Sequence, residues 1–157
     1  IEQKNYHSSI GTRLFLWQYS LQQFQQSPIY GVGTKQFRDG ICQQHEKGLI
    51  PTCQVHAHNI FLQFLATHGL IGFFGILSSF LIPLMFYIKH LYRRVDQDIA
   101  CYCMTGMCFS LYFMICGLTD FLFFTAFPSM LYFLITVTLM SFIKIKTNVN
   151  TINTDTF

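Results

Sequence analysis

Two histidines, His56 and His58, are separated by one alanine and stand immediately before an apolar run that continues to Ile88. An imidazole titrates near neutral pH, so a histidine here is suited to accept the proton of a reacting hydroxyl group. A structural role is the alternative, because polar residues also commonly lie where a helix begins. The choice between these roles depends on the elements that position the two side chains.

The composition is that of a membrane protein, because 52% of the 157 residues are hydrophobic and only 11% are charged. Three stretches without a charged side chain are each long enough to cross a bilayer, which takes about 20 residues. We expect transmembrane helices at about 64–88, 99–118 and 122–143. The chain begins on a polar stretch without an initiating Met or a signal-peptide pattern, and we interpret it as the C-terminal part of a longer protein.

Basic residues predict the orientation of these helices. Lys89, Arg93 and Arg94 lie between the first and the second helix, and Lys144 and Lys146 follow the third. Both segments are therefore expected on the cytoplasmic side.

Three crossings then divide the chain into three parts. Residues 1–59 form an extracytoplasmic loop region, residues 60–143 hold the three transmembrane helices, and residues 144–157 form a cytoplasmic tail. The polar, low-complexity composition of the tail predicts disorder. The fold class is thus expected to be that of an all-α polytopic membrane protein.

The loop region is expected to begin with an amphipathic helix. Apolar residues recur at helical spacing among glutamines: Leu14, Trp17, Leu21 and Phe24. Trp17 is interpreted as an anchor in that face or at the membrane interface. Pro28 ends the helix, and a tight turn with Gly31 and Gly33 follows. Residues 34–55 are irregular and polar, which predicts a loop. Asn59 is expected to cap the helix that follows, and Pro83 is expected to kink that helix.

Two C-x-x-H pairs form a second group with possible chemistry: Cys42 with His45, and Cys53 with His56. Zinc binds these ligand types, but the interval between the pairs is short for a zinc finger. An extracytoplasmic compartment favours oxidation, so a disulfide between Cys42 and Cys53 is the preferred interpretation.

Three stretches, "GTRLFLW", "SPIYGVGTKQF" and "HAHNIFLQFLATHGLIG", resemble the O-antigen ligase and polymerase superfamily. The last stretch fits the ligase-type pattern of a histidine, then Asn, Ser or Gln, nine residues and Gly-x-x-Gly, met here by His58, Asn59, Gly69 and Gly72. The resemblance covers residues 9–143 and implies a multi-spanning inner-membrane glycosyltransferase that takes a glycan from undecaprenyl pyrophosphate.

The resemblance implies two catalytic residues, Arg13 and His58. Arg13 matches the family's periplasmic arginine, and a guanidinium grips pyrophosphate oxygens and stabilises their developing charge. His58 matches the family's essential histidine and would take the proton of the acceptor hydroxyl. The implied reaction inverts the anomeric carbon and uses neither a metal nor another cofactor.

The expected substrate-binding residues are His56, Asn59, Lys35 and Arg38, of which the last two follow the glycine-rich turn and would attract anionic substrate. The implied partners are the lipid-linked glycan, a lipid A core acceptor and membrane lipid, with no nucleic acid. The implied location is the bacterial inner membrane, with residues 1–59 in the periplasm. The family also uses an upstream arginine that this chain lacks, so the 157 residues alone are expected to be inactive.

Other readings of the same residues stay open beside an O-antigen ligase. A repeat-unit polymerase and a protein O-oligosaccharyltransferase use the same donor and a similar histidine motif. A different class is a non-catalytic membrane transporter or subunit whose external loop binds a ligand or a metal. Without the resemblance, Arg13 would be interpreted as a solvated residue in the first turn of its helix.

Overall fold

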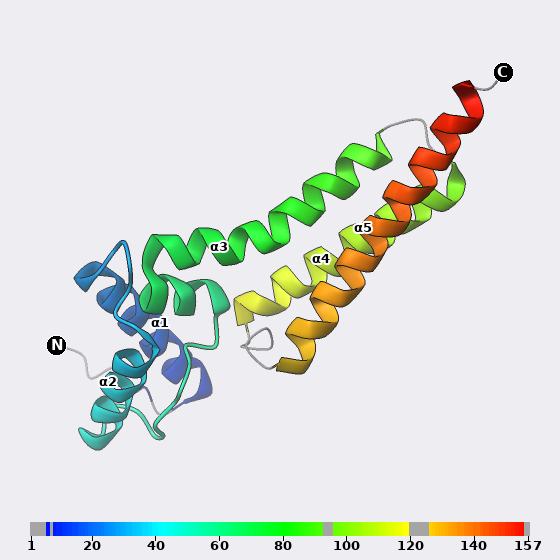
Figure 1. The fold of residues 1–157 in the computed structure, drawn as a ribbon. Helices are drawn as coiled ribbons and strands as arrows, with labels where there is room; N and C mark the ends of the chain where they lie inside the picture. The colour runs from blue at the N-terminus through cyan, green and yellow to red at the C-terminus, as the bar shows by residue number, and fades with distance from the viewer. Residues whose placement is uncertain (1–5, 7, 93–95, 120–125, 156–157) are drawn as a thin grey trace. The chain divides into compact units, whose positions relative to one another are not determined.

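The computed structural model of the chain describes residues 6, 8–92, 96–119 and 126–155, and over these residues its regular elements are all helices, with no strand (Figure 1). The described helices are α1 (Ser9–Gln26), α2 (Thr34–Glu46), α3 (Ile60–Leu91), α4 (Gln97–Thr119) and α5 (Ala126–Asp155). The predicted all-α fold class is confirmed. Arg93 and Arg94, which the orientation argument uses, lie outside the described residues.

Three of these helices, α3, α4 and α5, are long and apolar enough to cross a membrane. The chain is therefore a membrane protein. Its residues form two compact units, Ile1–Leu77 with Gly117–Phe121, and Ser78–Cys116 with Leu122–Phe157. The first part of α3 belongs to the first unit and the rest to the second.

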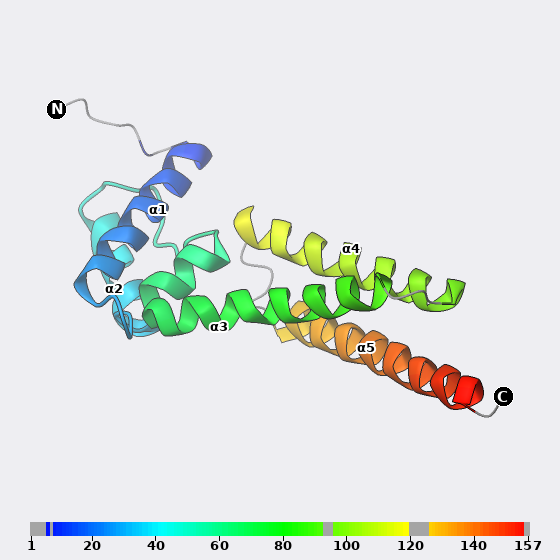
Figure 2. The ribbon, with the colours of Figure 1, turned by 90° about the horizontal axis from the view of Figure 1, so that it is seen from above.

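In the second unit, buried tyrosines join the long helices. The side chain of Tyr87 is fully buried, and its hydroxyl donates to the backbone oxygen of Thr136 at 3.1 Å. Tyr132 is also fully buried and donates to the backbone oxygen of Ser79 at 3.0 Å. These bonds satisfy hydroxyl groups that would be costly to leave unpaired in an apolar interior. They join α5 to α3, which lie side by side in Figure 2.

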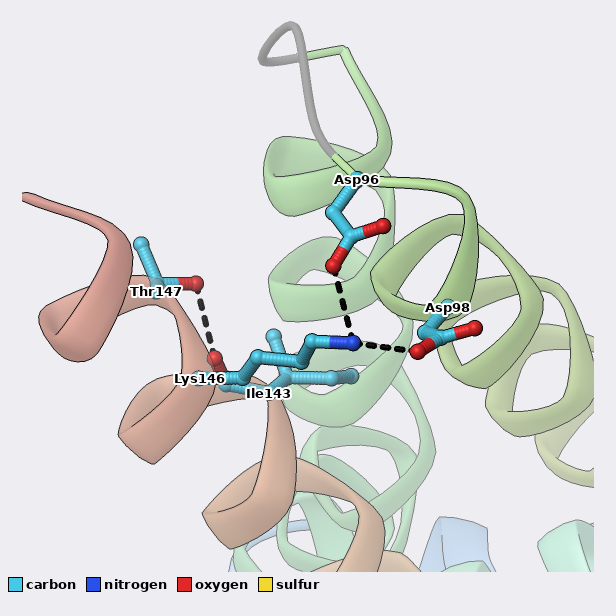
Figure 3. A network of polar contacts seen from close by, with 5 residues as sticks. All are labelled: Asp96, Asp98, Ile143, Lys146 and Thr147. Carbon is cyan, nitrogen blue, oxygen red and sulfur yellow. Dashed lines mark hydrogen bonds and ion pairs between the residues drawn. The ribbon is translucent and has the colours of Figure 1, made fainter.

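Helix α5 extends beyond the predicted last transmembrane helix and continues through Asp155, where the sequence predicts a disordered tail from residue 144 onward. Polar contacts support the extension (Figure 3). Lys146 forms ion pairs with Asp96, at 2.8 Å, and with Asp98, and the hydroxyl of Thr147 donates to the backbone oxygen of Ile143 at 2.7 Å. The disorder prediction is wrong for the described part of the tail, because composition does not register contacts with a neighbouring helix.

The ion pairs of Lys146 predict that the pKa of Asp96 depends on this lysine. The hydrogen bond from Lys146 lowers the pKa of Asp96 below the usual value for an aspartate. A depressed folded-state pKa stabilises the fold above the pKa of the unfolded chain, and this stabilisation is lost as the pH falls through the folded-state pKa. Lys146→Met should therefore raise the pKa of Asp96 in an NMR titration of its carboxyl carbon. Lys144→Met is the matched control, and equal titration curves for the two variants would contradict the assignment.

Helix α1 forms where it was predicted, and the face that it buries does not include Leu14 or Leu21. Ser8 caps it, because the Ser8 hydroxyl oxygen accepts from the backbone N–H of Gly11 at 3.0 Å. Its buried residues are Thr12, Leu16, Tyr19, Ser20 and Gln23. Leu14 and Leu21, which indicated the helix, are 47% and 44% exposed. The partner helix decides the face: Leu16 and Tyr19 share a core with Phe37 and Ile41 of α2.

Helix α2 occupies residues that were predicted to be an irregular loop. Phe37 and Ile41 are one helical turn apart and fully buried, which explains why the segment is helical despite its polar composition. Gly40 lies under the ring of Tyr19, and a Cβ atom there would collide with the Tyr19 hydroxyl oxygen. Two apolar residues among many polar ones are too few to reveal a helix by periodicity alone.

Helix α3 is broken at Gly69, where the backbone has φ 63° and ψ −156°. The helix expected after Asn59 is therefore interrupted at Gly69, a position where the sequence predicted no kink. A positive φ costs glycine little, so Gly69 accommodates the break. The break leaves backbone N–H and C=O groups without partners inside the helix.

The turn at residues 28–33 supplies those partners. Gly31, with φ 72°, lies so close to the break that a Cβ atom would collide with the backbone of Thr67 and His68. Four backbone hydrogen bonds join the two segments: Val32 N to Ala66 O at 2.9 Å, Gly33 N to Thr67 O at 3.0 Å, Leu70 N to Pro28 O at 2.8 Å and Ile71 N to Ile29 O at 3.4 Å. The hydrogen bonds from the glycine-rich turn therefore stabilise the bend of α3 at Gly69. Figure 1 shows this bend between the two parts of the helix.

Candidate functional site

The site is built around the segment that enters α3. Asn59 caps this helix as predicted, because its side-chain oxygen accepts from the backbone N–H of Leu62 at 3.0 Å. The side-chain nitrogen of Asn59 donates to the backbone oxygen of Leu118 at 3.1 Å. Only 8% of Asn59 is exposed. Both ends of this amide thus bind the protein itself, which gives the asparagine of the motif a structural role.

Two hydrogen bonds hold the backbone of the alanine between the two histidines, and we call this pair of bonds the clamp on Ala57. Ala57 is fully buried, its backbone N–H donates to the side-chain oxygen of Gln63 at 2.8 Å, and its backbone oxygen accepts from Trp17 Nε1 at 3.1 Å. These two bonds fix the backbone from which His56 and His58 project. Sequence reasoning missed this role for Trp17 and Gln63, although an amide within an apolar run was a signal that could have identified Gln63.

His58 has a backbone conformation that a histidine rarely adopts, with φ 50°. It is the single non-glycine residue with positive φ in the part of the chain that the structure describes. Such conformations cost free energy and cluster at functional sites, where surrounding contacts maintain them. The hydrogen bonds on the neighbouring Ala57 restrain the backbone next to His58. The ring of His56 lies against that of His58, with 4.4 Å between the ring centroids.

Arg13 and His58 line the same pocket, although 45 residues separate them in the sequence. The pocket holds about 250 Å³ and is completed by Ser9, Thr12, Pro51 and Gln54. None of the described residues that line it is acidic. A guanidinium, the hydroxyl group of Ser9 and an amide form a lining suited to an anion, and the imidazole adds a group able to accept a proton.

The other predicted site residues lie elsewhere. Lys35 is exposed at the start of α2 and lines a different pocket, between α1 and α2. Arg38 is exposed on α2 and lines neither pocket. The structure therefore separates these two cations from Arg13 and His58, because the helix at residues 34–46 carries them on its own surface.

A disulfide joins Cys42 to Cys53 and connects α2 to the segment that leads to His56. It occupies both sulfur atoms that the zinc alternative requires. His45 is engaged as well, since its Nδ1 donates to the backbone oxygen of Ile50 at 2.9 Å. The preferred interpretation of the sequence, a disulfide, is the arrangement that the structure contains.

Comparison with known proteins identifies a protein family for the part of the chain that holds this pocket. Residues 1–77 match the family model described as O-antigen ligase. An uncharacterised protein of Haemophilus influenzae is 26% identical over 110 residues, which cover 68% of this chain and 27% of that protein. The family match ends at the same residue as the first segment of the unit that contains both pockets. Residues 1–77 of this membrane protein therefore form a domain of the O-antigen ligase family.

Proposed function

We propose that this chain carries the catalytic residues of an O-antigen ligase, which transfers a glycan from undecaprenyl pyrophosphate to the lipid A core on the periplasmic face of the inner membrane. The observation that carries the proposal is the shared pocket of Arg13 and His58. The family of residues 1–77 supports a lipid-linked glycan as the substrate class.

The proposed step is a direct displacement at the anomeric carbon of the donor. A hydroxyl oxygen of the acceptor forms the new bond to that carbon, and the bond from the carbon to the pyrophosphate oxygen breaks with its electron pair. His58 takes the proton of the attacking hydroxyl group. Arg13 binds the departing pyrophosphate, whose negative charge increases as the bond breaks. The products are the inverted glycoside and undecaprenyl pyrophosphate.

The rest of the pocket supports these two roles. Ser9 lies about one helical turn before Arg13 on α1, and its hydroxyl group can donate to a phosphate oxygen. The clamp on Ala57 holds His58 at a fixed place beside them. Because the chain spans 27% of the length of the relative from Haemophilus influenzae, the whole activity belongs to the full-length protein and must be tested there.

The experiment that tests the proposal is a lipopolysaccharide gel from a bacterial strain that lacks the full-length protein. If the protein is a ligase, the strain makes bare lipid A core, and long glycan accumulates on undecaprenyl pyrophosphate. Rescue with the intact gene restores the ladder of long chains. A strain that attaches one repeat unit to the core and loses only the ladder would show a polymerase instead. Unchanged lipopolysaccharide would exclude both activities.

The clamp on Ala57 gives a further prediction about turnover. Trp17→Phe keeps an aromatic ring but removes the donor to the backbone oxygen of Ala57. We expect kcat to fall by about 10-fold to 100-fold with a smaller change in KM, because a displaced catalytic group slows the chemical step. Transfer kinetics of the purified full-length protein measure both constants. Tyr30→Phe changes an aromatic residue that is 74% exposed and serves as the control. Equal kcat values for the two variants would exclude a positioning role for Trp17.

A further inference from the structure

One wall of the pocket of Arg13 and His58 comes from a segment outside the helices. Residues 51–55, which we call the wall segment, lie between α2 and α3, and two of them, Pro51 and Gln54, line the pocket. The side-chain amide of Gln54 is the group of this wall that can hydrogen-bond to a bound molecule. The shape of the pocket therefore depends on what holds the wall segment in place.

Both ends of the wall segment are anchored in the core of the first unit. Ile50 precedes it and Ala57 lies two residues beyond it, and both are buried in the core shared with α1 and α2. The backbone oxygen of Ile50 accepts from His45 Nδ1 at 2.9 Å, and the clamp on Ala57 holds the other end. The backbone next to His58 is thus restrained by bonds that do not involve the wall segment.

The wall segment itself is tied to a helix by the disulfide. Cys53 lies in the middle of the segment and is bonded to Cys42 of α2. A hydrogen bond from the side-chain nitrogen of Gln54 to the hydroxyl oxygen of Thr52, at 2.8 Å, stays within the segment. Among the residues that the structure describes, no hydrogen bond or ion pair joins residues 51–55 to a helix. Because α2 packs on α1 through the buried core, the disulfide sets the position of the wall segment relative to α1.

We propose that the disulfide between Cys42 and Cys53 positions one wall of the pocket, so that the donor binds tightly only while this bond is intact. The inference rests on the proposed function. A cross-link restricts the conformations of the loop that it closes, so opening it frees the wall segment between its two anchored ends. Pro51 and Gln54 then no longer hold a fixed position beside Arg13. The contacts that are lost bind the substrate and take no part in the chemical step.

The bond is open to chemical reduction, because Cys53 is exposed. One thiolate of a dithiol such as dithiothreitol attacks a sulfur atom of the disulfide, and the S–S bond breaks as the other cysteine leaves as a thiolate. The second thiolate of the reductant then displaces the remaining cysteine from the mixed disulfide. Two electrons pass to the protein, and the products are the thiols of Cys42 and Cys53 and the cyclic disulfide of the reductant.

The test compares glycan transfer by the purified full-length protein before and after treatment with dithiothreitol. We expect reduction to raise KM for the lipid-linked glycan about tenfold, which corresponds to the loss of one or two hydrogen bonds, and to change kcat little. The reason is that a contact made equally in the ground state and in the transition state affects binding alone. Re-oxidation with oxidised glutathione should restore the original KM.

Two double variants assign the effect to this bond. Cys42→Ser with Cys53→Ser should have the KM of the reduced protein, with or without dithiothreitol. Cys101→Ser with Cys108→Ser is the matched control, because it removes two exposed thiols of α4 that form no disulfide. The control should keep both the original KM and the response to the reductant.

A measurement without substrate separates this inference from the proposed function. On reduction, hydrogen–deuterium exchange should become faster in the wall segment and stay unchanged in α1. Faster local exchange in a protein that transfers no glycan would refute the ligase and retain the positioning role of the disulfide. Transfer with an unchanged KM after reduction would refute the positioning role and retain the ligase. Faster exchange throughout α1 and α2 would also refute it, because the bond would then stabilise the whole unit.

Discussion

His58→Ala in the full-length protein is expected to lower the rate of glycan transfer by about 10²-fold to 10⁴-fold, the range that general base catalysis contributes. The reason is that the acceptor hydroxyl is a weak nucleophile until its proton is removed, and Arg13, which shares the pocket, cannot accept a proton at neutral pH. Transfer is measured with purified protein, lipid-linked glycan and lipid A core. The variant should accumulate in the membrane at the normal level.

Two controls distinguish lost catalysis from lost structure in this variant. Added imidazole should restore part of the transfer, because it can enter the space that the side chain leaves and take the proton. His90→Ala removes a histidine of the second unit, whose Nδ1 donates to the backbone oxygen of Phe86, and should transfer normally. Normal transfer by His58→Ala, or a loss that follows a loss of protein from the membrane, would contradict the role of His58 as the base.

Gly31→Ala is expected to destabilise the first unit by about 2–5 kcal/mol, a sum of the left-handed backbone penalty and the overlap of the added carbon. The overlap arises because the Cβ atom would collide with the backbone of Thr67 and His68 at the break of α3. Relief requires that the turn at residues 28–33 move away, which breaks its hydrogen bonds to Ala66 and Thr67. The measurement is the midpoint of thermal unfolding in detergent, together with resistance to a protease.

Gly48→Ala is the matched control for this prediction. Gly48 also has a positive φ, 73°, but no atom lies within 4 Å of the position that its Cβ would take. Gly48→Ala should be destabilised only by the left-handed backbone penalty, about 1–2 kcal/mol. If the two variants unfold at the same temperature, the packing of the glycine-rich turn against the break does not stabilise the fold.

The sequence predicted the fold class well, because long uncharged apolar runs have few alternatives to membrane-spanning helices. The sequence failed to predict structure that depends on contacts between distant segments. Phe37 and Ile41 make α2 helical through burial against α1, which no local pattern in a polar segment reveals. The apolar spacing of Leu14 and Leu21 correctly indicated a helix but not the face that packs, since half-exposed apolar residues are common on the surface of proteins.

The candidate site divides in the same way between what the sequence indicated and what only the structure provides. The resemblance to the O-antigen ligase and polymerase superfamily selected Arg13 and His58, and both line one pocket. The sequence could not show the clamp on Ala57, because hydrogen bonds from Trp17 and Gln63 to a backbone depend on how distant segments meet. Nor could it show the two glycines in contact at the break of α3, since Gly31 and Gly69 are far apart in the chain.

The central claim is that Arg13 and His58 act together on one reacting group. A double-mutant cycle of Arg13→Gln and His58→Ala, measured as kcat/KM for glycan transfer by the purified full-length protein, tests it most directly. We predict that each single variant loses at least about 100-fold, and that the double variant loses far less than the product of the two, because residues that act as a unit are not additive. Losses that simply multiply, or a single variant that transfers at the normal rate, would contradict the account.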